Sequence, residues 1–510
     1  MTHHSGGFNL IELLIALACI AALTSMAWPN YQSLVLRSQR AQARASLLQA
    51  AHWFERTASA NGAYTATNDV PASVLLNRGS TLQNERYQHG SKPHTHRHAF
   101  GRSNGRYLRH TDGEQFRRTK RSRLQPNCRA MLEPISRAIH NCVMSFSAHD
   151  TTHMTHALGL AREALFLTSP NPRVGCVIVD AHNQVLGYGH TQRAGEAHAE
   201  VMALRDAQAK RHDVKGATAY VTLEPCSHQG RTGPCCDALV QAGIGRVVVA
   251  EGDPNPLVGG QGIARLRAAG VQVDVGLLEA QAHELNIGFF KRMLHGTPWV
   301  RMKIAASLDG QTALENGVSQ WITSAPARED GHAWRARACA VLTGIGTVIA
   351  DDPQLDVRAV PTPRQPTLVV MDSKLETPVT AKLFASQRPV WIYCAVNNAE
   401  RRTALEAQGA QVICLANHSG KVDLAAMLKD LGDRQINEVH VEAGHKLNGS
   451  LLREGLVNEL LTYLAPKLIG QGRGMTNLGP FTTLDDAKAL SFHEVTQIGP
   501  DLRILARLAR

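Results

Sequence analysis

The stretch that decides the fold has three parts: His-Ala-Glu at 198–200, Glu-Pro-Cys-Ser-His at 224–228 and Gly-Pro-Cys at 233–235. The imidazole of His198 and the thiolates of Cys226 and Cys235 supply three ligands of a tetrahedral zinc ion and leave the fourth position to water. A zinc site with an open position is typical of catalysis. The alternative is that the three residues are buried separately, since cysteine also behaves as a small hydrophobic residue.

Glu200 lies two residues after His198, near enough to face the bound water without being a ligand. The order His-x-Glu, Pro-Cys and a second Cys resembles the zinc nucleobase deaminases, in which the glutamate moves protons while zinc activates water. The resemblance implies that Glu200 is the catalytic residue and that His198, Cys226 and Cys235 hold Zn²⁺.

Length and charge place this motif within a larger chain. The 510 residues suffice for about three domains. Residues 1–140 hold 18 Lys and Arg against 7 Asp and Glu, and residues 141–510 hold 36 of each kind, so the net charge of +11 is N-terminal. The part with the zinc motif is neutral, and we expect it to bind no nucleic acid. Ten cysteines at irregular spacings favour a reducing compartment, the cytoplasm.

The first 30 residues conflict with a cytoplasmic location. Gly-Phe-Asn-Leu-Ile-Glu at 7–12 precedes an apolar run at 13–28, and together they are long enough to cross a bilayer. This stretch resembles the leader of type IV prepilins. The resemblance implies cleavage after Gly7, methylation of Phe8 and a role for Glu12 in assembly in the membrane. A buried amphipathic helix is the alternative.

A change of composition separates this segment from the zinc motif. Residues 89–140 carry 12 Lys and Arg and 6 His, with few aliphatic side chains, and cannot bury enough surface to fold. We expect a disordered linker, with a nuclear-localisation or nucleic-acid-binding patch as the alternative. The expected divisions are a prepilin-like segment at 1–88, a basic linker at 89–153, a deaminase domain at 154–297 and a reductase domain at 298–510.

Hydrophobic spacing predicts the elements around the zinc motif. We expect a helix at 156–168, strands at 174–179, 185–189, 217–223 and 246–250, and helices beginning near His198 and after Cys235. This alternation predicts an α/β domain of three layers, cytidine-deaminase-like by its motif. His198 and Cys235 then lie at helix N-termini, where peptide dipoles favour ionised thiols. Cys176 and Cys236 are expected to be structural.

Three further motifs resemble the deaminase half of the bifunctional riboflavin-biosynthesis deaminase–reductases. They occupy 168–175, 227–232 and 253–256. The resemblance implies substrate contacts from Asn171, His228 and Arg231. Polar loop residues of these motifs, taken singly, are more often turn formers than ligands. Gly233 stands where the family usually has proline, which affects the stiffness of the loop between the two cysteines.

The remainder of the chain predicts a second α/β domain without a Rossmann fingerprint. Strands are expected at 299–305, 340–343, 367–371, 390–393, 438–441 and 459–464. The stretches 303–310, 319–323, 351–358 and 441–444 resemble the reductase half of the same family, which implies a dihydrofolate-reductase-like fold that binds NADPH. The implied cofactor contacts are Ala305, Trp321, Thr347, Asp351, Ser373 and Glu442. The implied substrate contacts are Ser319, Arg335, Leu355 and Arg358, of which the arginines suit a phosphate or, alternatively, form surface ion pairs.

The two halves imply consecutive reactions on one small phosphorylated pyrimidine, 2,5-diamino-6-(ribosylamino)-4(3H)-pyrimidinone 5′-phosphate. Zinc-dependent hydrolysis removes the 2-amino group, and NADPH-dependent reduction converts the ribosyl chain to give 5-amino-6-(ribitylamino)uracil 5′-phosphate. We expect a homo-oligomer. A nucleic-acid-editing deaminase and a pilus structural subunit are the alternatives. Because a prepilin leader would export the reductase away from NADPH, we expect residues 1 to about 150 to come from a gene fusion or an erroneous reading of adjacent genes.

Overall fold

The computed structural model describes residues 146–227, 233–255 and 258–508. The predicted prepilin-like segment and all of the basic linker up to residue 145 lie outside these ranges, and so do His228 and Arg231. Within the ranges described, no helix combines the length and the hydrophobicity that crossing a bilayer requires.

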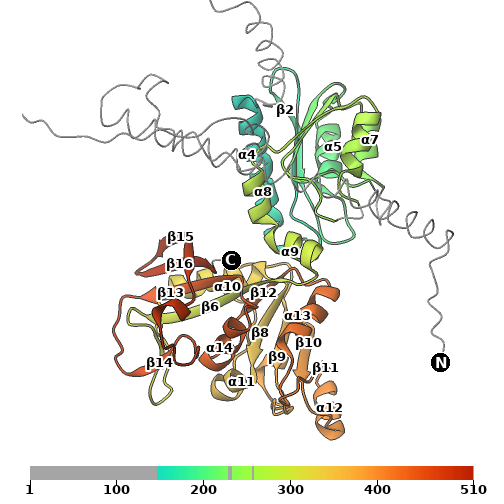
Figure 1. Cartoon of the computed structure of the whole chain (residues 1–510). Coiled ribbons are helices and arrows are strands. Elements are labelled where there is room, and N and C mark those ends of the chain that lie inside the picture. The colour runs from blue at the N-terminus through green and yellow to red at the C-terminus, as the bar shows by residue number, and fades with distance from the viewer. Residues whose placement is uncertain (1–145, 228–232, 256–257, 509–510) are drawn as a thin grey trace, which may run out of the picture. The chain divides into compact units, whose positions relative to one another are not determined.

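The deaminase domain alternates strands and helices as expected (Figure 1). Its elements are α4 (Ala148–Glu163), the 3-10 helix η2 (Ala164–Phe166), β1 (Gly175–Val179), β2 (Val185–His190), α5 (Ala199–Ala209), β3 (Thr218–Val221), α6 (Cys235–Gln241), β4 (Arg246–Val249), α7 (Gln261–Ala268), β5 (Gln272–Val275), α8 (Glu279–Leu285) and α9 (Ile287–His295). The four predicted strands are confirmed within two residues at each end, and β5 is an additional strand.

A five-stranded sheet of order β2-β1-β3-β4-β5 forms the middle layer. β1 runs antiparallel to β2 and β3, whereas β3, β4 and β5 are parallel. Because side chains alternate along each strand, the buried strands supply apolar groups to both faces. α5, α6 and α7 contribute to the core on one face, and α4 and α8 contribute to the core on the other (Figure 1). The predicted three-layer architecture is confirmed.

The first helix of this domain begins earlier than expected. α4 begins at Ala148, and Ser147 caps it through a reciprocal pair of hydrogen bonds with Asp150. Asp150 and His153 are buried, so residues assigned to the linker belong to the folded domain. The helix ends at Glu163 rather than at 168, and a 3-10 turn follows it. The Ser-x-x-Asp spacing is itself a sequence signal for the start of a helix. The prediction based on apolar periodicity alone did not include it.

The reductase domain is built on a larger sheet. Its elements are β6 (Trp299–Ser307), β7 (Gln311–Leu314), α10 (Ala325–Arg337), β8 (Ala340–Gly344), α11 (Ile345–Asp351), β9 (Thr367–Met371), η3 (Lys382–Phe384), β10 (Val390–Cys394), α12 (Ala399–Glu406), β11 (Ala410–Cys414), α13 (Leu424–Asp433), β12 (Glu438–Val441), α14 (His445–Arg453), β13 (Glu459–Ala465), β14 (Gly472–Gly474), η4 (Leu484–Asp486), β15 (Leu490–Ile498) and β16 (Asp501–Leu508). All six predicted strands are confirmed within two residues.

Nine strands form one sheet in the order β11-β10-β9-β8-β12-β6-β13-β16-β15. The strands from β11 to β13 are parallel, and β16 and β15 continue the sheet in antiparallel pairing. α13 and α14 pack in the core on one face, and α11 and α12 pack in the core on the other. The inner strands β8, β9 and β10 are buried on both faces, which explains their largely apolar sequences.

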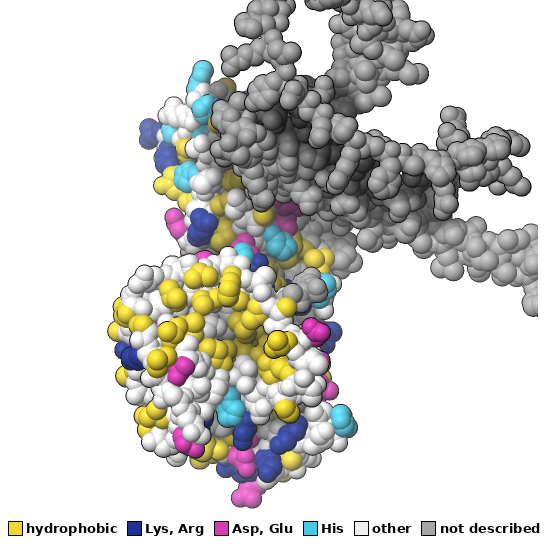
Figure 2. Space-filling view, turned by 60° about the vertical axis from the view of Figure 1, so that its left-hand side comes forward, with side chains coloured by type: hydrophobic (Ala, Val, Ile, Leu, Met, Phe, Trp, Pro, Cys, Tyr) yellow, Lys and Arg dark blue, Asp and Glu magenta, His cyan; other side chains and the backbone are white. Residues whose placement is uncertain are grey.

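The last strand pair leaves hydrophobic side chains exposed. β15 is an edge strand, and its Phe492 is 74% exposed. Exposed apolar residues on and near this strand also include Leu484, Leu490, Val495 and Leu502. Figure 2, in which the left side of Figure 1 comes forward, shows hydrophobic side chains gathered on the reductase domain. An open edge with apolar side chains is a surface suited to a further protein chain.

Candidate active sites

Three elements of the deaminase domain bring the predicted zinc ligands together. His198 is the N-cap of α5, Cys226 follows β3, and Cys235 is the first residue of α6. The Nδ1 atom of His198 lies 3.6 Å from the Sγ atom of Cys226 and 3.4 Å from the Sγ atom of Cys235. The carboxyl end of one strand and the N-termini of two helices therefore meet at this point.

These distances fit a tetrahedral zinc ion. Zn–S bonds of about 2.3 Å and Zn–N bonds of about 2.0 Å at a tetrahedral angle separate nitrogen from sulfur by about 3.5 Å. Ligand atoms of the three residues all lie within 4.8 Å of one another, and the described residues contain no other such group. The donor set of one imidazole and two thiols matches the preference of zinc for nitrogen and sulfur.

Electrostatics around the ligand set favour a bound cation. Glu200 is buried, and this burial together with the nearby Cys226 raises its pKa to about 7. A hydrogen bond with Cys235 lowers the pKa of Cys226 to about 4, whereas the same interaction raises the pKa of Cys235. One thiol thus ionises at the expense of the other, because two adjacent thiolates repel. A divalent cation between the sulfurs removes this repulsion.

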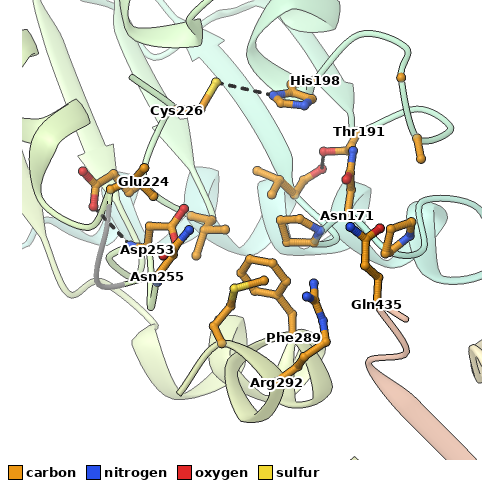
Figure 3. Close-up of a pocket in the computed structure, with 18 of the residues that line it drawn as sticks. Asn171, Thr191, His198, Glu224, Cys226, Asp253, Asn255, Phe289, Arg292 and Gln435 are labelled. Atoms are coloured by element: carbon orange, nitrogen blue, oxygen red, sulfur yellow. Dashed lines mark hydrogen bonds between the residues drawn. The ribbon is translucent and has the colours of Figure 1, made fainter. Parts of the chain in front are cut away.

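A cavity of about 520 Å³ lies beside the ligand set. Four of the predicted residues line it: Asn171, His198, Glu200 and Cys226. Figure 3 shows Asn171, His198 and Cys226 around this cavity. Cys235 is fully buried, as are the structural cysteines Cys176 and Cys236. The structure therefore brings the predicted base contact, proton shuttle and metal ligands into one site.

Glu224, the first residue of the Glu-Pro-Cys motif, fixes one wall of this cavity. Its Oε2 atom accepts hydrogen bonds from the backbone N–H groups of Asp253 (3.1 Å) and Gly260 (2.9 Å). Its Oε1 atom accepts from Gly262 (2.9 Å) and Ile263 (3.2 Å). Four donors compensate for burying the carboxylate, so we assign Glu224 to loop positioning rather than to proton transfer.

Sequence reasoning missed another wall of the cavity. Phe289, Arg292 and Met293 lie on α9, and Gln435 lies on the turn after α13, in the reductase domain. These residues are far from the zinc motif in sequence, and no short motif marks them. Only the packing of the two domains identifies them as cavity residues.

In the reductase domain, predicted cofactor residues gather at the carboxyl ends of parallel strands. β8 and β12 are neighbours, but the chain continues from β8 to β9 on one side and from β12 to β13 on the other. Such a switch point is where open α/β sheets bind ligands. Thr347 in α11 follows β8, and a Cβ atom added to Gly444 after β12 would lie 3.9 Å from its Oγ1 atom. A glycine at the N-cap of α14 lets backbone N–H groups approach a dinucleotide phosphate.

The other predicted cofactor residues of this edge come from three strands. Ala305 lies near the end of β6, Ser373 follows β9 and accepts a hydrogen bond from the backbone of Val422, and Glu442 follows β12. Because the strands are parallel, their carboxyl ends share one edge of the sheet. The shared strand edge, Thr347 at the start of α11 and the N-cap glycine of α14 are consistent with a dinucleotide site at this edge.

Two predicted substrate arginines converge on Asp356. Arg335 pairs with both oxygens of Glu442, at 2.7 and 3.0 Å, and also donates to the Asp356 carbonyl. The Nη1 atom of Arg358 lies 2.6 Å from the Asp356 carboxylate. Arg335 therefore contacts both Glu442, a predicted cofactor residue, and Asp356, which also pairs with the predicted substrate residue Arg358.

Lys303, to which sequence reasoning assigned no role, lies next to this ion pair. Burial lowers the pKa of its ammonium group, and Glu442 acts in the opposite direction. Lys303 precedes Ala305 by two residues on β6, so both side chains point to the same face of the sheet. The alternation of side chains along the predicted strand was the sequence signal that could have placed Lys303 on the same face as Ala305.

The remaining predicted residues occupy more peripheral positions. Trp321 is 62% exposed, and the guanidinium of Arg328 lies 4.5 Å from its ring centre. Ser319 is half-buried in the segment between β7 and α10. Asp351 is the exposed last residue of α11, and Leu355 is buried in the left-handed conformation at φ 54°.

Family models match three parts of the chain. The model of the cytidine and deoxycytidylate deaminase zinc-binding region matches residues 147–251, and that of the RibD C-terminal domain matches residues 298–504. The model of the type IV minor pilin ComP, DNA uptake sequence receptor, matches residues 29–101, which lie outside the described ranges. The N-terminal pilin resemblance and the two enzyme domains thus have separate matches.

Similar proteins cover the two enzyme domains together. The riboflavin biosynthesis protein RibD of Escherichia coli is 46% identical over 366 residues, 69% of this chain and 98% of that protein. RibD of Aquifex aeolicus is 41% identical over 355 residues, 70% of this chain and 97% of that protein. The solved structure of Acinetobacter baumannii RibD is 42% identical, with a TM-score of 0.65, and covers 71% of this chain and 99% of that chain.

A solved structure from Thermotoga maritima carries the same two domains. It is described as a diaminohydroxyphosphoribosylaminopyrimidine deaminase/5-amino-6-(5-phosphoribosylamino)uracil reductase. It is 30% identical, with a TM-score of 0.64, and covers 71% of this chain and 99% of that chain. The predicted cytidine-deaminase-like and dihydrofolate-reductase-like folds are confirmed, and the chain belongs to the RibD family of bifunctional riboflavin-biosynthesis deaminase–reductases.

Proposed function

We propose that this enzyme deaminates 2,5-diamino-6-(ribosylamino)-4(3H)-pyrimidinone 5′-phosphate and then reduces its ribosyl chain, using zinc and NADPH. The observation that carries the proposal is the buried Glu200 beside His198, Cys226 and Cys235 in a cavity of about 520 Å³. The reductase domain in the same chain supplies the second reaction.

For the deamination, we assign the metal site to His198, Cys226 and Cys235 and the proton transfer to Glu200. Zinc bound there would act as a Lewis acid and lower the pKa of a water molecule. Glu200, whose pKa is raised by its burial, would accept a proton from a water molecule and later donate it to the departing ammonia. Water thereby replaces the 2-amino group with a carbonyl. Asn171, His228 and Arg231 are assigned to the substrate.

For the reduction, we assign the cofactor to the carboxyl ends of the parallel strands, where α11 and α14 begin. NADPH supplies the hydride when it is bound. Ala305, Thr347, Ser373 and Glu442, together with Trp321 and Asp351, are the proposed cofactor residues. Ser319, Arg335, Leu355 and Arg358 are the proposed substrate residues. The exposed Arg358 suits the phosphate because a guanidinium binds its oxygens in pairs, whereas Arg335 already pairs with Glu442. These residues orient C1′ of the opened sugar towards the hydride donor.

We also propose a homo-oligomer that forms through the reductase domain. β15 is an edge strand with exposed backbone groups, and Leu484, Phe492 and Val495 are 93, 74 and 54% exposed. Figure 2 shows the hydrophobic side chains of this domain. A second copy of the same edge would cover them. Light scattering of the purified protein should give at least twice the 55.4 kDa mass of one chain.

The location that fits both reactions is the cytoplasm, where NADPH is available and thiols stay reduced. The seven cysteines that the structure describes are all free. For the N-terminal segment we retain the proposal of a pilin fragment joined by gene fusion or by an erroneous reading of adjacent genes. A pilus subunit is the alternative function of that segment, supported by the match over 29–101.

The decisive experiment incubates the purified, zinc-loaded chain with the diamino substrate and NADPH. We expect ammonia release together with loss of nicotinamide absorbance at one equivalent each. Omission of NADPH should leave ammonia release intact, because deamination comes first. Ammonia released from single-stranded DNA or RNA, with none from the small substrate, would instead favour a nucleic-acid-editing deaminase.

A further inference from the structure

One short segment of the reductase domain borders the deaminase cavity. Gln435 lines that cavity, and Asn437 is buried between the two domains. The amide nitrogen of Asn437 donates to the carbonyl of Pro170 at 2.8 Å, directly before Asn171. Its amide oxygen accepts a hydrogen bond from Nε of Arg292 at 2.5 Å. A single side chain of the reductase domain thus contacts both the base-recognition segment and α9.

Arg292 is held in place but retains free donors. Its guanidinium lies 5.9 Å from the ring centre of Phe289, and its Nε atom is taken up by Asn437. Neither Nη atom donates to any residue that the structure describes. The side chain is half-buried and therefore partly removed from water, and this burial lowers the pKa of its guanidinium. A fixed, partly desolvated guanidinium with two free Nη atoms is suited to an oxyanion.

The charges of the cavity make Arg292 distinctive. The described lining residues include the acids Glu196, Glu200, Glu224 and Asp253 but no other arginine or lysine. A phosphate dianion in such a cavity requires a fixed cation, since burying it unpaired is costly. Among the described lining residues, Arg292 is the one that carries a permanent positive charge.

The position of Arg292 matches the geometry of the substrate. In Figure 3, His198 and Cys226 lie at one end of the cavity residues, and Arg292 rises from α9 at the other end. The amino group that is hydrolysed and the 5′-phosphate are likewise at opposite ends of the substrate, separated by the sugar. We propose that Arg292 binds the 5′-phosphate of the deamination substrate and that Asn437 of the reductase domain is its positioning residue. This inference rests on the proposed function.

The test measures deamination by the full, zinc-loaded chain with two substrates, the 5′-phosphate and the same compound without its phosphate. The wild type should prefer the phosphorylated substrate by about 10- to 100-fold in kcat/KM, mainly through KM, as one charge-assisted contact predicts. Arg292→Gln should lower kcat/KM for the phosphorylated substrate by about the size of this preference and change kcat/KM for the dephosphorylated substrate much less, so that the preference is lost. Arg292→Lys keeps the positive charge but lacks the paired N–H donors of a guanidinium. It should therefore retain part of the preference for the phosphorylated substrate.

Two further variants separate positioning from folding. Asn437→Ser should reduce the preference for the phosphorylated substrate, because kcat/KM falls further for this substrate than for the dephosphorylated one. Arg205→Gln removes an exposed arginine of α5 outside the cavity lining and should behave as wild type. Zinc content and the rate of the reduction step report on the fold of each variant.

The results of this test distinguish a failure of the phosphate-binding inference from a failure of the proposed function. If Arg292→Gln keeps the full preference for the phosphorylated substrate, the phosphate is bound elsewhere and the inference is wrong. If the wild type releases ammonia from neither substrate, the proposed function itself is wrong, and the inference falls with it.

Discussion

Arg173 of the deaminase domain lies 2.5 Å from Glu438 of the reductase domain, and both side chains are buried. Glu438 also accepts hydrogen bonds from Arg301 and Arg337, each at 2.9 Å. A buried carboxylate with three guanidinium partners is compensated, although burial alone would favour its neutral form. The acid at the start of β12 therefore connects the two domains electrostatically.

Glu438→Gln should destabilise the protein by roughly 3–5 kcal/mol, because removing one partner of a buried network leaves the others uncompensated. Urea denaturation measures the loss. Lys429→Gln is a suitable control, since its pair with Asp433 is exposed and contributes less than about 1 kcal/mol. Equal midpoints for the Glu438 variant and wild type would show that the cluster is not a stabilising contact.

The same residue predicts a pH dependence. Burial raises the pKa of Glu438, but its three arginine partners outweigh that effect and hold the pKa well below its usual range. A depressed pKa in the folded state gives stability that is present above the unfolded value of about 4.3 and is lost as the pH falls below it. The stability difference between wild type and Glu438→Gln should therefore be constant from pH 6 to 8 and shrink below about pH 4. A difference that grows in acid would contradict this assignment.

Glu200→Gln should keep the metal and lose deamination. The substitution leaves His198, Cys226 and Cys235 unchanged but removes the proton carrier, which should lower kcat for ammonia release by at least about 10²-fold. Zinc content by mass spectrometry should remain at one per chain, and reduction of already deaminated substrate should persist. Substantial ammonia release by the zinc-loaded variant would remove Glu200 from the mechanism.

Removal of zinc should separate the two reactions. Chelation should stop deamination but leave the reduction of deaminated substrate, because the three metal ligands all lie in the deaminase domain and the proposed cofactor residues all lie in the reductase domain. Arg358→Ala should do the converse, weakening reduction by about 10-fold or more through loss of a phosphate contact. If chelation stops both reactions while circular dichroism shows an intact fold, zinc must also support the reductase domain.

The zinc motif was predictable because all of its residues lie within 38 positions and their spacing is chemically specific. The buried strands were equally readable, since burial on both faces produces continuous apolar runs. β15 was missed because its side chains are largely exposed. Arg292, Gln435 and Asn437 could not be found, because their role depends on how two domains pack and not on a local pattern.

The start of α4 decides where a working enzyme can begin. Asp150 lies 2.7 Å from both Nη1 of Arg246 and the hydroxyl of Tyr220, and it completes the capping box with Ser147. A chain that begins at Met144 keeps these contacts, whereas one that begins at Met154 loses the cap and the carboxylate. The shorter chain should be less stable, because it loses the first turns of α4 and the acceptor of the Tyr220 hydroxyl, and because Arg246 keeps only Asp274 of the acidic partners that the structure describes.

We therefore expect the chain from Met144 to Arg510 to bind zinc and perform both reactions, and the chain from Met154 to unfold at lower urea. Asp150→Asn in the longer chain isolates the contribution of the carboxylate and should reproduce part of the loss. Mass spectrometry of the native protein should find no peptides from residues 1–140 joined to the enzyme, since a prepilin leader would carry the reductase away from NADPH. Recovery of such joined peptides from a membrane fraction would show that the N-terminal segment belongs to the working protein.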